Sequence, residues 1–283
     1  MNSNFTAPPD RSGDNDAYAP IELRGTRQFA LHSAEGREYR ILMSIPDREA
    51  PASGYPVIYM LDGHALFATV LDAERAQSRR ADKTGVAPSV IVGIGYPSGL
   101  PFSPERSYDY TLPVPAENLP ASRDGKPWPK HGGADIFLNF IENVLKSKIE
   151  SILPIDRSRQ TLFGHSFGGL FTLHTLFTRP EAFRCYVAGS PSLHWARPLI
   201  EQEEAAFIQK LHTEKHELNL LIALGELEGD PPHHMVQNAR ALYERLQPLR
   251  EYGLNINFRL FEGENHGSTL PSIVSPMLRT AAL

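Results

Sequence analysis

The chain has little cysteine and no long run of apolar residues. Cys185 is the single cysteine among 283 residues, so an internal disulfide is excluded. No stretch approaches the roughly 20 apolar residues that a membrane-crossing helix needs. The first 20 residues lack the basic start and apolar centre of a secretory signal. The expected location is therefore the cytoplasm, with the periplasm as the alternative if a signal peptide has been removed.

Clusters of positive charge are also missing. The chain carries 28 Lys and Arg against 33 Asp and Glu, which gives a net charge of −5, and it contains no dense basic run. This balance argues against a nucleic-acid partner. With 41% hydrophobic and 22% charged residues, the composition is ordinary for a globular protein with a substantial core.

Eight stretches of the chain have the composition of β-strands. The first two are separated by Glu35-Gly36, which predicts a hairpin. The later stretches are continuous apolar runs, which are typical of strands covered on both faces, as in a parallel sheet. The strand-like stretches are 26–33, 38–44, 56–61, 89–96, 160–163, 185–189, 218–224 and 256–261.

Helical patterns lie between these strands. The clearest runs from 134 to 152, where apolar residues recur every three or four positions until Pro154 stops the helix. The others are 65–80, 169–177, 199–212, 234–249 and a terminal one from about 268. A hairpin followed by alternating strands and helices predicts an α/β fold with a doubly wound, mostly parallel sheet. In that architecture, sites gather at the carboxyl ends of the strands.

No linker divides the alternating pattern. We therefore expect a disordered tail over residues 1–20 and one domain over 21–283. The exception to the alternation is the segment 97–133, which has eight prolines and no helical period. Loops of this length are usually functional or disordered. Because the segment follows a strand, we expect it to lie over the active face as a lid or rim.

The pentapeptide Gly-His-Ser-Phe-Gly at 164–168 lies between a strand-like stretch and a helical one. This context is typical of a nucleophile elbow, in which a serine occupies a strained turn above the sheet and the flanking glycines allow close approach of the backbone. Ser166 is therefore the candidate nucleophile. The alternative is an inert serine in a glycine-rich turn, and a partner base would decide between the two.

A serine hydroxyl needs an adjacent base to become nucleophilic. If the chain order is serine, acid and histidine, then His233, His234 and His266 qualify. His266 is preferred because it lies in a glycine-containing loop between the last strand and the last helix. That position puts it at a strand carboxyl end, on the same face as the elbow. The alternative is a solvent-exposed loop histidine.

The acid that orients this histidine is expected after the strand at 218–224. The chain offers Glu226, Glu228 and Asp230 there. Glu228 is preferred because it stands three residues past the glycine that ends the strand, with Glu226 next and Asp230 last; a dyad without a functional acid stays open. A metal cluster of Glu228, Asp230 and the two histidines at 233 and 234 is a rival, but adjacent histidines seldom bind one ion.

Stabilising an oxyanion needs two backbone N–H groups. The first is expected from Phe167, directly after the nucleophile. The second is expected from His64, in the loop that follows the strand ending in Leu-Asp-Gly at 61–63. We expect Asp62 to fix this loop by accepting backbone hydrogen bonds.

With these residues identified, the chain resembles the esterase-D-like α/β-hydrolases. Within that family it is most similar to the esterases of catecholate siderophores, the trilactones of the enterobactin and salmochelin type. Four stretches carry the resemblance: Tyr-Pro-Val-Ile-Tyr-Met-Leu-Asp-Gly at 55–63, Arg-Ser-Tyr-Asp-Tyr-Thr at 106–111, Gly-His-Ser-Phe-Gly-Gly-Leu-Phe at 164–171 and Ser-Pro-Ser-Leu-His-Trp at 190–195. The second and fourth are the more specific to the siderophore branch.

The resemblance implies an α/β-hydrolase fold with an N-terminal antiparallel hairpin, Ser166 as the nucleophile and His266 as the base. It also implies that Arg106 contacts the substrate and that the region of Trp195 lines the pocket. The alternative for Arg106 is an ion pair with Asp109 that braces the loop. No cofactor is implied, although iron can arrive inside the substrate.

The chemistry of such a substrate gives separate support. A ferric tris-catecholate trilactone is large, aromatic and anionic, so its esterase needs cations and stacking surfaces. The segment 97–133 offers Arg106, Tyr108, Tyr110, Arg123, Lys126, Trp128 and Lys130. The sequence thus predicts a serine ester hydrolase acting on a small-molecule siderophore ester. A general short-chain carboxylesterase and a non-catalytic hydrolase-fold binding protein are the alternatives.

Overall fold

The structure is a computed structural model that describes residues 22–115, 117, 119 and 127–283. The tail expected over 1–20 lies outside the described residues, as do Arg123 and Lys126 of the segment 97–133. None of the described helices combines the length and the apolar character that crossing a bilayer requires.

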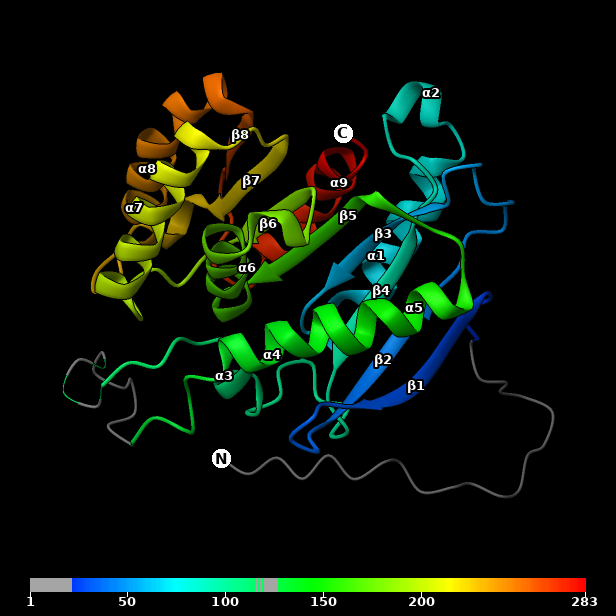
Figure 1. Cartoon of the computed structure of the whole chain (residues 1–283), viewed down its shortest axis with the longest axis horizontal. Coiled ribbons are helices and arrows are strands. Elements are labelled where there is room, and N and C mark those ends of the chain that lie inside the picture. Colours follow the sequence, from blue (N-terminus) through cyan, green and yellow to red (C-terminus); the bar gives the residue numbers. More distant parts are fainter. Residues whose placement is uncertain (1–21, 116, 118, 120–126) are drawn as a thin grey trace.

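One eight-stranded sheet organises the molecule, in the order β1-β2-β4-β3-β5-β6-β7-β8 (Figure 1). β1 pairs with β2 and β2 with β4 in antiparallel fashion, and every later pairing is parallel. The strands are β1 Thr26–His32, β2 Glu38–Ser44, β3 Tyr55–Met60, β4 Val90–Gly95, β5 Ile155–His165, β6 Cys185–Gly189, β7 Leu218–Gly225 and β8 Leu254–Phe261. This topology confirms the α/β-hydrolase fold with its N-terminal antiparallel hairpin.

Helices cover both faces of the sheet. The α-helices are α1 Gly63–Ser78, α2 Ala81–Thr84, α3 Arg106–Asp109, α4 Ala134–Phe140, α5 Lys146–Ile152, α6 Phe167–Thr178, α7 Arg197–Thr213, α8 Met235–Leu246 and α9 Thr269–Ala281. A π-helical turn, Ile141–Leu145, joins α4 to α5, and 3-10 turns occupy Pro180–Ala182, Glu226–Glu228 and Gln247–Tyr252. The helix expected over 134–152 is therefore continuous.

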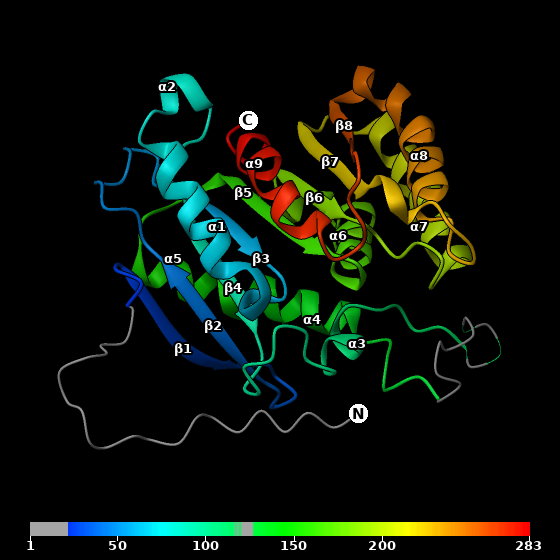
Figure 2. The ribbon, with the colours of Figure 1, turned by 180° about the vertical axis from the view of Figure 1, so that it is seen from behind.

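The two faces hold separate apolar cores. Seen from behind, α1 and α9 lie across one face (Figure 2), where Ile58 and Met60 of β3 are buried with their apolar side chains. The opposite face carries α4, α5 and α6 (Figure 1), and there Val57 and Tyr59 of the same strand are buried. Successive residues of a strand point to opposite faces, so a strand covered on both faces is apolar throughout.

Two local features differ from the sequence expectation. β5 begins at Ile155, five residues before the expected start, because Ile155 pairs with Tyr55 ahead of a register shift. Its polar residues at 156–159 gave no strand signal. The segment 97–133 contains the four-residue helical turn α3. A four-residue turn is too short to show a helical period.

Candidate active site

The elbow has the strained geometry that its sequence predicts. β5 ends at His165 and α6 begins at Phe167, with Ser166 between them at φ 62° and ψ −117°. This φ is uncommon for a residue other than glycine. A Cβ on Gly164 would overlap with the carbonyl of Gly168, so the turn requires glycine there. The Ser166 hydroxyl lies 3.3 Å from the hydroxyl of Ser192.

His266 lies in the loop between β8 and α9, as expected. Its Nδ1 atom is 2.7 Å from Oε2 of Glu228, and its side chain is 45% exposed while that of Glu228 is 2% exposed. Asn265 shapes the loop, because its Oδ1 accepts hydrogen bonds from the N–H groups of Gly267 and Ser268. The imidazole is therefore held on one side by a carboxylate and open to solvent on the other.

Glu228 is the carboxylate that meets the histidine. Its Oε1 accepts hydrogen bonds from the Gly225 N–H at 2.8 Å and from the Ser190 hydroxyl at 2.7 Å. Burial alone would raise the pKa of Glu228, but the hydrogen bonds from His266, Gly225 and Ser190 outweigh it and lower the pKa below its ordinary value. The carboxylate is thus kept charged.

The two other acidic candidates lie elsewhere. Glu226 is exposed, and its Oε2 accepts a hydrogen bond from the N–H of Gly263, while Asp230 is exposed at the surface. Among the described residues, no group of three or more His, Cys, Asp or Glu side chains is arranged to hold a metal ion. The rival metal cluster at 228–234 therefore has no support in this arrangement.

His165 contacts the candidate base and directly precedes the candidate nucleophile. Its ring centroid is 4.6 Å from that of His266, and it is the residue directly before Ser166. Burial, with a smaller contribution from His266, lowers the pKa of His165 to about 3, so this ring is neutral. The described residues show no hydrogen bond between Ser166 and His266. Catalytic hydrogen bonds are often long before substrate binds.

Two helices begin just after the carboxyl ends of the neighbouring strands β3 and β5. Phe167 is the first residue of α6, and His64 is the second residue of α1. Neither N–H can have a partner within its own helix, because the first N–H groups of an α-helix have none. The turn before α1 lies close to β4, since a Cβ on Gly63 would come within 3.0 Å of the backbone of Gly93. The ring of His64 packs against Gly95.

Asp62 and Arg106 form an ion pair that the sequence did not predict. Arg106 Nε and Nη2 each donate to one carboxylate oxygen of Asp62 at 2.8 Å. The alternative pairing of Arg106 with Asp109 is not made, because Asp109 accepts hydrogen bonds from Tyr96 at 2.9 Å and Arg37 at 3.2 Å. The Asp62 carboxylate therefore binds a guanidinium, where backbone donors had been expected.

Trp195 lies beneath the aromatic residues near the elbow. It is 1% exposed, and its ring centroid is 4.4 Å from Trp128 and 5.0 Å from Phe167. Trp128, from the end of the proline-rich segment, is only partly buried. Trp195 is thus buried against Trp128 and Phe167, and Trp128 is the more accessible of the two tryptophan rings.

Sequence reasoning missed the two serines that follow β6. Ser190 contacts Glu228, the candidate acid, and Ser192 contacts the candidate nucleophile. Because β6 is the strand next to β5 in the parallel sheet, polar residues at its carboxyl end were a usable signal.

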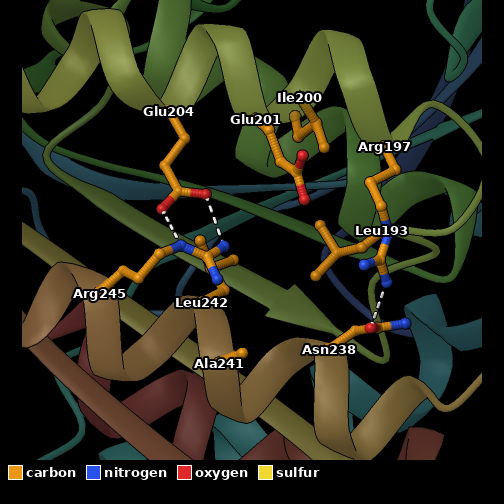
Figure 3. A pocket seen from close by; sticks show the side chains of 9 residues that line it. All are labelled: Leu193, Arg197, Ile200, Glu201, Glu204, Asn238, Ala241, Leu242 and Arg245. Carbon is orange, nitrogen blue, oxygen red and sulfur yellow. Dashed lines mark hydrogen bonds and ion pairs between the residues drawn. The ribbon is translucent and has the colours of Figure 1, made fainter.

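A separate groove lies between α7 and α8 (Figure 3). Across it, Arg245 donates two hydrogen bonds to Glu204, at 2.6 and 2.8 Å, and Arg197 bonds to Asn238. Its lining residues are Leu193, Arg197, Ile200, Glu201, Glu204, Asn238, Ala241, Leu242 and Arg245. None of them is a candidate catalytic residue.

Comparison with known proteins links this geometry to esterases. The model of a family described as putative esterase matches residues 33–269. The ferri-bacillibactin esterase BesA of Bacillus subtilis (strain 168) is 49% identical over 273 residues, covering 96% of this chain and 94% of that protein.

Two solved structures extend the similarity to three dimensions. The BES protein from Bacillus cereus has a TM-score of 0.87 at 45% identity, covering 94% of this chain and 98% of that one. The enterobactin hydrolase IroE, solved as a complex with DFP, has a TM-score of 0.70 at 31% identity, covering 91% and 94%.

Proposed function

This chain belongs to the putative esterase family, and from that membership and the geometry of the site we propose that it is a serine hydrolase of siderophore macrolactones. Its activity class is carboxylic ester hydrolysis, since similar proteins along nearly its whole length are named as esterases. The proposal assigns the residues that carry the reaction and the chemical class of the ester.

In this proposal Ser166 is the nucleophile and His266 the general base. The Ser166 hydroxyl attacks the ester carbonyl while His266 takes its proton through Nε2. Glu228, bonded to Nδ1 at 2.7 Å, fixes the tautomer and stabilises the imidazolium. His266 then returns the proton to the leaving alkoxide, and the acyl-enzyme is released when the same imidazole activates a water molecule.

The oxyanion of each tetrahedral intermediate is assigned to the N–H groups of Phe167 and His64. Both belong to the first turn of a helix, where unpaired N–H groups and the helix dipole favour negative charge. One donor of this kind contributes about 10²–10³ to kcat in serine hydrolases.

The substrate class rests on the similar proteins and on the cations and aromatic rings around α3. BesA is named for ferri-bacillibactin and IroE for enterobactin. Tyr108 of α3 has the Lys130 ammonium 4.1 Å from its ring centroid and the Arg37 guanidinium at 4.9 Å. Cations and aromatic rings suit an anionic catecholate ester. A ferric ion would arrive as part of this substrate.

The observation that carries the proposal is the position of His266. Its Nδ1 is bonded to a buried carboxylate, and its ring centroid lies 4.6 Å from that of His165, which precedes Ser166. An imidazole that is oriented by a charged acid and held beside a strained serine is the arrangement that acyl transfer requires.

The test compares ferric enterobactin with p-nitrophenyl butyrate as substrates of the wild-type protein and of Ser166→Ala. We expect the wild type to hydrolyse both and to have the higher kcat/KM for the siderophore. Ser166→Ala should lose about 10⁴-fold or more in kcat on each. Hydrolysis of the small ester alone would replace the siderophore substrate by a general carboxylesterase activity. Unchanged hydrolysis by Ser166→Ala would contradict the nucleophile.

A further inference from the structure

We infer that Arg106 is a positioning residue for the oxyanion hole, and that it acts through Asp62. This inference rests on the proposed function, because it concerns how the His64 N–H is held in place. It gives α3 a role in the reaction that differs from the lid or rim role expected for the segment 97–133.

The guanidinium of Arg106 joins two chain segments of the site. Nε and Nη2 form the paired bonds to Asp62, which follows β3, and Nη2 also donates to the carbonyl of His165 at 3.1 Å. His165 is the last residue of β5, directly before Ser166. One side chain therefore fixes the loop after β3 relative to the serine turn. The side chains of the pair are 12% and 6% exposed.

Asp62 needs such support because its backbone is strained. It has φ 51° and ψ 48°, the left-handed conformation, which is unfavourable for a residue other than glycine. A second contact from the same segment holds it, since the Asp62 N–H donates to the hydroxyl of Tyr110 at 3.2 Å. Tyr110 is fully buried and directly follows α3. His64 lies only two residues after Asp62, so its N–H takes its direction from this turn.

Aromatic rings enclose the guanidinium beside its two partners, Asp62 and the His165 carbonyl, and leave little room for a substrate group. Its carbon lies 5.2 Å from the ring centroid of Tyr110 and 5.7 Å from that of Phe167. Burial opposes its charge, but the facing carboxylate of Asp62 outweighs burial and raises the pKa of Arg106 above its ordinary value. The Arg106 side chain is thus charged, enclosed and bonded to two partners, as expected of a residue that holds two chain segments together.

The turn that carries Arg106 is itself anchored. Asp109, three residues on, is 1% exposed and is held by the Tyr96 hydroxyl and by Arg37. Because the contacts of Asp109 hold α3 in place, Arg106 has a fixed position from which to bond Asp62.

The test separates positioning from substrate contact by the split between kcat and KM. The variants are Arg106→Ala, Asp62→Asn and the double variant, assayed on neutral p-nitrophenyl butyrate and on anionic ferric enterobactin. We expect kcat to fall about 10- to 100-fold on both substrates in each single variant, with KM changed less than about 3-fold. The double variant should be no slower than the slower single variant, because both remove one interaction.

The matched control is Arg245→Ala, which also removes a doubly bonded Arg–carboxylate pair, between α7 and α8 (Figure 3). Its kcat should equal that of the wild type. Two results would overturn the inference: a rise in KM confined to ferric enterobactin for Arg106→Ala, or a wild-type kcat for Asp62→Asn. If Arg106→Ala does not fold, Asp62→Asn alone decides. The p-nitrophenyl butyrate assay suffices even when the siderophore is not a substrate, and Ser166→Ala tests the nucleophile separately.

Discussion

At the scale of single residues, both carboxylate oxygens of Glu228 have hydrogen-bond partners. Oε2 meets His266, while Oε1 meets Ser190 and the backbone of Gly225. The bonds to Oε1 fix the direction of the carboxylate, so that Oε2 presents a defined acceptor to the imidazole. The orientation of the proposed base therefore depends on Ser190 and Glu228, which lie 38 positions apart in the sequence.

Glu228→Gln tests this orientation. The amide keeps the shape of the side chain but cannot stabilise an imidazolium, so kcat on p-nitrophenyl butyrate should fall about 10²- to 10⁴-fold. Because the pKa of Glu228 lies below its ordinary value, the wild-type acid stays charged through the neutral range. Ser190→Ala, which keeps the bond to His266, should lose less activity. Equal rates for Glu228→Gln and the wild type would favour a Ser-His dyad.

The positions of several residues of the candidate site could be predicted from the sequence, for physical reasons that differ. Ser166 and His266 follow strand ends with glycines nearby, and such positions can be recognised from the sequence alone. The choice of Glu228 over Glu226 rested only on spacing. The Arg106–Asp62 bond was missed, because no pattern in a sequence tells which carboxylate a loop arginine reaches across 44 positions.

At the scale of elements, the elbow depends on close contact between β5 and α6. A methyl group at Gly164 would overlap with the Gly168 carbonyl in the first turn of α6. Gly164→Ala should therefore lower the free energy of unfolding by about 1–3 kcal/mol and abolish ester hydrolysis. Gly36→Ala is the comparison, because open space surrounds Gly36 despite its positive φ. It should retain hydrolysis. Full activity of Gly164→Ala, measured beside urea unfolding, would show that the turn tolerates displacement.

His174 links α6 to two neighbouring helices. Its Nδ1 lies 3.0 Å from the carboxylate of Glu203 in α7, and its Nε2 lies 3.4 Å from Asp135 in α4. Burial alone would lower the pKa of His174, but the two carboxylates outweigh it and raise the pKa to about 9. A raised pKa stabilises the fold below the unfolded value, roughly 6.5, and this contribution is lost as pH rises through about 9.

The prediction for His174 is a pH-dependent difference between two proteins. Urea unfolding of the wild type and of His174→Gln should differ by roughly 1–3 kcal/mol more at pH 6 than at pH 10. Taking the difference removes the titration of other groups, such as Lys146, whose pKa burial lowers to about 8. A pH-independent difference would mean that His174 is neutral in the folded state.

Most elements could be predicted because the strands are continuous apolar runs and the helices have a clear period. Strand ends that consist of polar residues could not be predicted from apolar runs, as the start of β5 shows. The turn α3 escaped too, since four residues held by side-chain contacts to other segments carry no periodic signal.

At the scale of the whole molecule, the sheet shields its centre on both faces. Cys185 lies in β6 between β5 and β7, is 2% exposed, and burial raises the pKa of its thiol to about 12. A thiol reagent such as DTNB should therefore react with Cys185 only as fast as the molecule unfolds, with a rate that rises with urea concentration. Rapid reaction in native buffer would indicate local opening of the central strands.

In the proposed mechanism, which joins distant parts of the molecule, His266 of the β8–α9 loop activates Ser166 of the β5–α6 turn. The most direct measurement is the rate and site of modification by a fluorophosphonate, followed by intact-mass and peptide mass spectrometry. We expect one adduct, on Ser166, and a rate at least about 10²-fold lower in His266→Ala. An adduct on another residue, or an unchanged rate in His266→Ala, would contradict it.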